Sequence, residues 1–258
     1  MNEKIEVMHA LPQTIDEVIE ELNAIIEDAV EKNNYNAIFA YVYKRTTIEI
    51  KKAIEDTYFE DNQGMEVFDV LFANLYIKAY HGYQIQSKVS ACWQKAFDEG
   101  KIKLTYLQHL LLGMNAHINF DLGVAAAIYT KNSDIEEISN DFRKVNQILF
   151  NLTNEMQSKL ARVSPMLFLL DILGGKNDEM LSNFGIKMTR GQAWRFARNL
   201  WQKHQDEQSS FQSEVDGNVA LIASKIAKPR FISLKVFLWC IGKFERKPLI
   251  EVLQILND

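Results

Sequence analysis

The chain has 258 residues, of which 47% are hydrophobic and 24% are charged, so it is long and apolar enough to fold around a sizeable core. Its formal net charge is −5, and no basic cluster appears, so nucleic acid is not an expected partner. Residues 1–13 lack the basic start, apolar stretch and small-residue cleavage site of a secretory signal, and we expect a cytoplasmic location. Cys92 and Cys240 match no metal-binding or redox spacing.

Helical periodicity dominates the rest of the sequence. Apolar residues recur at spacings of three and four, and only four prolines and eleven glycines interrupt them. No segment favours a sheet. These features predict an all-α fold, a single multi-helix, bundle-like domain over residues 1–258 with a buried central helix. The expected helices are 14–32, 36–60, 65–82, 84–98, 103–129, 134–160, 165–174, 189–206, 210–227, 232–243 and 248–256.

Several helix starts carry capping signatures, in which a polar side chain supplies an acceptor for the first free amides. The pairs are Thr14 with Glu17, Ser133 with Glu136, and Thr189 with Gln192, and Pro248 suits the first turn of the last helix. The connection from 174 to 190 is either an ordinary surface loop or a lid over a site.

The most informative segment is the weakly charged stretch from Leu104 to Thr130. Its polar residues would make a membrane span costly, and it is expected to be a helix buried in protein. At about 100° per residue, His117 and Asp121 fall on its apolar arc, one turn apart. Asn115 and Asn119 form a second i, i+4 pair at the border of that arc.

Glycine at position 113 in this helix suggests close packing or ligand access, because glycine weakens a helix relative to alanine.

Two interpretations explain the polar groups on this helix, because buried polar groups need hydrogen-bond partners. In the structural one, Asp121 orients His117 and the asparagines bridge neighbouring helices. In the functional one, Asn115, His117, Asn119 and Asp121 line an interior pocket. There His117 is a general base or a metal ligand with Asp121 as its partner, and the asparagines orient a substrate.

The string Gly113-Met114-Asn115-Ala116-His117-Ile118-Asn119-Phe120-Asp121-Leu122 resembles the signature of a bacterial family of unknown function, Met-Asn-Ala-His-Ile-Asn-x-Asp-Leu. Further strings fit the same family in order: Phe72-Ala73-Asn74-Leu75-Tyr76, Asp141-Phe142, Val145-Asn146, Ala193-Trp194 and Leu200-Trp201. The resemblance covers about residues 15–202, and residues 203–258 match less clearly. It implies that the four polar residues form one constellation, but it supplies no activity.

This chain departs from the family's pattern at Gly123, where members often have proline, so the helix is expected to continue there.

Two further groups are candidates for substrate binding. Asp141 and Asn146 lie on the next helix, which is expected to fold back against the central one. In one interpretation both side chains face His117. In the other, Asp141 belongs to a solvated face of its helix. Trp194, Arg198 and Trp201 share a face of a later helix, where the arginine binds an anion or stacks on the rings.

A divalent metal would use His117 and Asp121, with His81 as a candidate third ligand, because catalytic zinc needs three protein ligands. No P-loop, dinucleotide-binding glycine pattern or serine elbow is present. The sequence therefore predicts an enzyme or a small-molecule-binding domain with an interior polar pocket. The alternatives are a carrier of an apolar ligand and a structural or interaction protein with a buried hydrogen-bond network. The oligomeric state is not predicted.

Overall fold

The computed structural model describes residues 10–164, 166 and 186–258, and every regular element in these ranges is helical. No strand occurs among the described residues, which confirms the predicted all-α fold. The predicted helix at 165–174 lies outside the described residues apart from Met166, as does most of the 174–190 connection.

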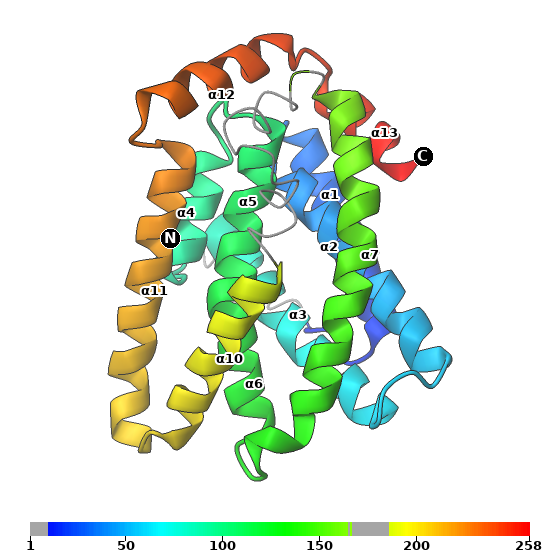
Figure 1. Ribbon diagram of the computed structural model, residues 1–258, viewed down its shortest axis with the longest axis vertical. Helices are drawn as coiled ribbons and strands as arrows, with labels where there is room; N and C mark the ends of the chain where they lie inside the picture. Colours follow the sequence, from blue (N-terminus) through cyan, green and yellow to red (C-terminus); the bar gives the residue numbers. More distant parts are fainter. Residues whose placement is uncertain (1–9, 165, 167–185) are drawn as a thin grey trace, which may run out of the picture.

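The helices are named in chain order (Figure 1). They are α1 (Ile15–Glu31), α2 (Asn36–Glu55), α3 (Asn62–Gln84), α4 (Ala91–Glu99), α5 (Tyr106–Ala116), the π-helical turn η1 (His117–Asp121), α6 (Leu122–Tyr129), the 3-10 turn η2 (Ile135–Ile138), α7 (Ser139–Val163), α10 (Ile186–Gln202), α11 (Gln205–Ala227), α12 (Ile232–Phe244) and α13 (Leu249–Asn257).

The central helix is the unbroken run of α5, η1 and α6. It begins with a capping box in which the Thr105 hydroxyl accepts from the Gln108 amide and the Gln108 side chain accepts from the Thr105 amide. α5 packs against α2, α4 and α11, and α6 packs against α3 and α10 (Figure 1). The helix continues through Gly123, as the sequence predicts.

This central run is also the one helix in the described part of the chain that is long and apolar enough to cross a membrane. Of its most apolar window, 61% is buried inside the protein, as expected for a core helix. The run is therefore weak evidence for a membrane span.

Several predicted helix boundaries are wrong, among them the 210 start of α11, which begins at Gln205, and two of the errors arise because left-handed residues end or delay a helix without a glycine or proline signal. α2 ends at Glu55 rather than near residue 60, just before Thr57 at φ 54°. The helix predicted from residue 84 begins only at Ala91, after a turn that contains Gln86 at φ 59°.

The predicted helix caps are confirmed at one site and displaced at the others. The Thr14 hydroxyl accepts from the Glu17 amide. Asp134, not Ser133, accepts from the Glu136 amide at the start of η2. α10 begins at Ile186, so Thr189 lies inside it, and Pro248 is the residue before α13.

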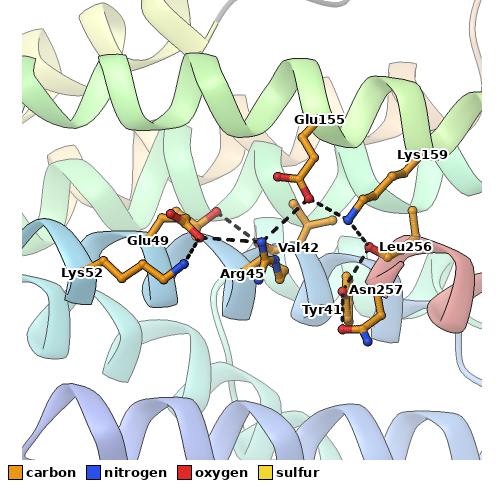
Figure 2. A network of polar contacts seen from close by, with 10 residues as sticks. Tyr41, Val42, Arg45, Glu49, Lys52, Glu155, Lys159, Leu256 and Asn257 are labelled. Atoms are coloured by element: carbon orange, nitrogen blue, oxygen red, sulfur yellow. Dashed lines mark hydrogen bonds and ion pairs between the residues drawn. The ribbon is translucent and has the colours of Figure 1, made fainter.

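A network of polar contacts ties α2, α7 and α13 together (Figure 2). Glu155 of α7 contacts both Arg45 of α2, at 3.7 Å, and Lys159, at 2.6 Å. The Lys159 ammonium and the Tyr41 hydroxyl both donate to the Leu256 carbonyl of α13, at 3.0 and 3.1 Å. These contacts fix α7 against α2, and the two helices form one wall of the cavity described below.

Gly113 allows α5 to lie unusually close to α2, because a Cβ at this position would come within 2.2 Å of Cγ of Phe39. Gly113→Ala is therefore expected to lower the free energy of unfolding by about 1–3 kcal/mol, the cost of overpacking a core. Gly217→Ala is the matched control. It lies inside α11 with nothing within 4 Å of the added Cβ, so it should raise stability by about 0.5–1 kcal/mol. Urea denaturation measures both, and equal effects would contradict the close-packing argument.

Candidate functional site

The central helix contains a π-helical turn, with hydrogen bonds that span five residues, at the position of His117. In η1 the Leu122 amide donates to the His117 carbonyl, five residues back, in place of the usual four. Such π-turns are rare and often occur at functional sites, because they weaken the helical ladder and reposition side chains. The turn spans His117 to Asp121, the histidine and aspartate of the predicted constellation.

Three side chains form a buried hydrogen-bonded group at this turn. Nδ1 of His117 lies 3.0 Å from Oδ2 of Asp121, and Nε1 of Trp93, from α4, donates to the same oxygen at 2.8 Å. The Asp121 oxygen accepts from the indole, which can only donate. It accepts from His117 as well when the ring proton is on Nδ1, which leaves the lone pair on Nε2. His117 and Asp121 therefore lie at hydrogen-bond distance, as their i, i+4 spacing predicts.

Aromatic rings surround the imidazole. Phe72 of α3 stacks on it at 3.7 Å between ring centroids, and Tyr43 of α2 meets its edge at 4.3 Å. Phe39, Tyr76 and Trp93 lie within 6.2 Å. Burial here lowers the pKa of His117 well below its usual value, so the ring is neutral at pH 7. The same burial raises the pKa of Asp121, against the effect of the Trp93 hydrogen bond.

His117 lies in the wall of a partly open cavity of about 420 Å³. Helices α2, α3, α5, α7, α11 and α12 contribute mostly aliphatic and aromatic side chains to its lining. Nε2 of His117 has no hydrogen-bond partner among the described residues, and the same holds for two other lining groups, the Tyr43 hydroxyl and Oδ2 of Asp69.

Asp69 is the acidic residue among the described residues that line the cavity. Burial, followed by the nearby charge of Glu66, raises the pKa of Asp69 to about 7. The site therefore combines an apolar lining with a neutral imidazole, a phenol and a carboxyl whose pKa is raised to about 7. These groups can accept and donate hydrogen bonds without adding a full charge.

Most of the sequence that builds this cavity matches a known protein family. The model of a family of unknown function, DUF5995, matches residues 15–229. The chain belongs to this family. The match extends past the predicted 15–202 core through α11, and it leaves out the cavity residues of α12, Leu234 and Leu238. Comparisons with curated proteins and with solved structures found no match.

In this DUF5995 member the four residues of the predicted constellation divide into two pairs. Asn119 Nδ2 donates to Asn115 Oδ1 at 3.0 Å, and Asn115 Nδ2 donates to the Val219 carbonyl of α11 at 3.0 Å. The asparagines thus bridge neighbouring helices, as the structural interpretation predicts. Of the four, only His117 lines this cavity, and a site role for Asn115, Asn119 and Asp121 stays a prediction.

Asp141 faces neither His117 nor solvent. It is buried, accepts from the amides of Glu60 and Asp61 at 2.9 to 3.0 Å, and pairs with Lys144 at 3.2 Å. Burial alone would raise the pKa of Asp141, but these donors outweigh it and lower the pKa. Both predictions for Asp141 are corrected: it holds the turn before α3. Asn146 accepts from Nε of Arg190 at 2.6 Å.

The predicted arginine between two tryptophans is also corrected. Arg198 is exposed and pairs with Glu136 at 3.1 Å. Trp194 packs on Phe142 at 4.8 Å between ring centroids, and Trp201 donates to the Thr130 carbonyl. The cation that stacks on an aromatic ring in this region is Arg190, whose guanidinium lies 4.2 Å from the centre of the Phe142 ring.

The predicted metal ligands do not gather a complete donor set. Nδ1 of His117 is bonded to Asp121, and His81 lies instead beside Glu21 of α1, at 2.6 Å. Across the described ranges, no group of three or more His, Cys, Asp or Glu side chains is arranged to hold a metal ion. Catalytic zinc usually has three protein ligands, so the donor set shown does not fit such a site.

Sequence reasoning missed Trp93, Tyr43, Asp69 and Arg190 as parts of the site. Asp69 had a usable signal, because it shares a helical face with Phe72 and Tyr76 at spacings of three and four. An acid on an aromatic face is either paired or perturbed. The other three are ordinary core or helix residues in sequence, and only the packing brings them together.

Proposed function

We propose that the protein binds a small, largely apolar molecule in this cavity, with a polar group of that molecule bonded to His117, Tyr43 or Asp69. The observation that carries the proposal is a set of three buried polar atoms, on residues that line the cavity, without a described partner: Nε2 of His117, the Tyr43 hydroxyl and Oδ2 of Asp69. Each buried polar atom left unpaired costs about 1–3 kcal/mol, so a ligand that pairs with them recovers binding energy.

The volume and lining of the cavity support the same function. About 420 Å³ lies within the range of small-molecule sites, which are mostly apolar with a few converging polar groups. The rigid surroundings of His117 preorganise its free nitrogen, because Asp121 and the stacked Phe72 ring fix the imidazole plane.

The chemistry of His117 favours binding over proton transfer. A general base works best with a pKa near the working pH, whereas burial lowers the pKa of this imidazole well below its usual value. As a neutral ring it is a good hydrogen-bond acceptor and a weak base. We therefore assign it the recognition of a donor group on the ligand.

Blocking the cavity tests the proposal. Met114 lines the cavity on α5, and Met114→Trp adds bulk one turn before His117. We expect this variant to weaken binding of N-phenyl-1-naphthylamine, an apolar fluorescent probe with one N–H donor, by about tenfold or more. A fluorescence titration, with excitation beyond the tryptophan band, measures the affinity.

Ile128→Trp is the matched control, because Ile128 is an exposed residue later in the same helical run. It should bind the probe as the unmodified chain does. If the unmodified chain does not bind the probe, or if both variants bind it equally, the polar groups at η1 act as an internal network and the binding proposal fails.

A further inference from the structure

Arg190 is a buried cation in the wall of the cavity. It lies in the second turn of α10, and 4% of its surface is exposed. Its Nε donates to Oδ1 of Asn146 at 2.6 Å, and its Nη2 donates to the Phe142 carbonyl at 2.7 Å. These contacts and the stacked Phe142 ring fix the guanidinium plane against α7.

The described residues that contact Arg190 do not balance its charge. Both acceptors are neutral, and no carboxylate of the described residues forms an ion pair with it. A guanidinium has five N–H donors, so three remain after these two bonds. Burial lowers the pKa of Arg190 to about 9, and the group is still protonated at neutral pH. A buried charge without a counter-charge is costly, and such groups are normally paired.

We propose that Arg190 binds the carboxylate of an amphipathic ligand whose apolar chain fills the cavity, which makes the ligand class a fatty acid or a similar long-chain carboxylate. This inference rests on the proposed function: the carboxylate binds Arg190, and a second polar group along the chain, such as a hydroxyl, bonds to His117, Tyr43 or Asp69. A planar guanidinium matches a carboxylate with two parallel hydrogen bonds. The remaining lining is mostly aliphatic and aromatic, as an alkyl chain requires.

The charge of the site favours a carboxylate over a phosphate monoester. One buried guanidinium balances one negative charge, whereas a phosphate monoester carries nearly two at neutral pH. The other cation of the lining, Lys225, is exposed on α11, where water solvates its charge. Arg190 is therefore the cation that needs an anionic partner.

The test compares ligands that differ only in the head group. Displacement of N-phenyl-1-naphthylamine at pH 8 gives the affinities of dodecanoate, dodecan-1-ol and dodecyl phosphate for the unmodified chain. We expect dodecanoate to bind about tenfold or more tightly than the alcohol, and more tightly than the phosphate. Equal affinity for the acid and the alcohol overturns the inference, and tighter binding of the phosphate overturns the choice of carboxylate.

Substitutions at Arg190 test whether this residue causes the preference for dodecanoate. Arg190→Met should remove the preference for dodecanoate and leave the affinity for dodecan-1-ol within about twofold, and Arg190→Lys should keep part of it. Arg195→Met, an exposed position on the same helix, is the control and should bind as the unmodified chain does. A preference that survives in a folded Arg190→Met variant overturns the inference.

The two proposals fail in different ways. If the unmodified chain binds neither the probe nor any of the three ligands, the proposed function itself fails. If it binds the probe and the alcohol but does not prefer the acid, the cavity remains a binding site and only the role of Arg190 is lost. The head-group preference of the unmodified chain decides the inference even if Arg190→Met does not fold.

Discussion

Asp121→Ala is expected to lower the free energy of unfolding by about 3–5 kcal/mol, the usual cost of removing one partner from a buried charged or hydrogen-bonded group. Oδ2 of Asp121 is the shared acceptor for the Trp93 indole and Nδ1 of His117, and alanine supplies no replacement for it. Both donors would be left unpaired in a dry core. Urea denaturation followed by far-UV circular dichroism measures the loss.

Asp121→Asn tests how much the hydrogen bonds of Asp121 contribute to stability, apart from its charge. The amide oxygen can occupy the position of Oδ2 and accept from both donors, so this variant loses only the negative charge. Burial already raises the pKa of Asp121, which means that the charged form is costly in this position. We therefore expect Asp121→Asn to cost about 1 kcal/mol or less. If the alanine variant is as stable as the asparagine variant, the hydrogen bonds at η1 do not hold the central helix in place.

The sequence predicted the parts of the site that lie along one helix. The i, i+4 spacing of His117 and Asp121 determines that their side chains are neighbours, whatever packs around them. The pairing of Asn115 with Asn119 follows from the same rule. The buried central helix was predictable because its stretch is apolar and nearly uncharged.

The cavity was not predictable, because its position depends on which helices pack together. Tyr43, Asp69 and Arg190 come from α2, α3 and α10, and no local pattern says that these helices meet around His117. The direction of Asp141 was misjudged for the same reason: its partners, the amides of Glu60 and Asp61, lie in a turn that is distant in sequence. The π-turn escaped prediction because periodicity does not reveal one added residue in a helix.

Asp69→Asn is expected to stabilise the protein at pH 8 by up to about 4 kcal/mol, which is the energy of a pKa difference of about three units. The pKa of Asp69 rises from 3.8 in the unfolded chain to about 7 in the folded protein, first because of burial and then because of Glu66. Between these values the folded state holds a proton that the unfolded state has released. The stability of the unmodified chain therefore falls as the pH rises from about 4 to about 7, and asparagine, which does not titrate, removes this loss.

The pH dependence of the difference between the two proteins is the decisive result. Urea denaturation at pH 4, 6 and 8 should show a small difference at the lowest pH and the full one at the highest. Asp56→Asn removes the same charge from an exposed position at the end of α2, so its difference from the unmodified chain should stay small across the range. A constant difference for Asp69→Asn would mean that Asp69 titrates alike in the folded and unfolded states. The cavity wall would then hold an ordinary carboxylate, and ligand recognition by an Asp69 carboxyl of raised pKa would be wrong.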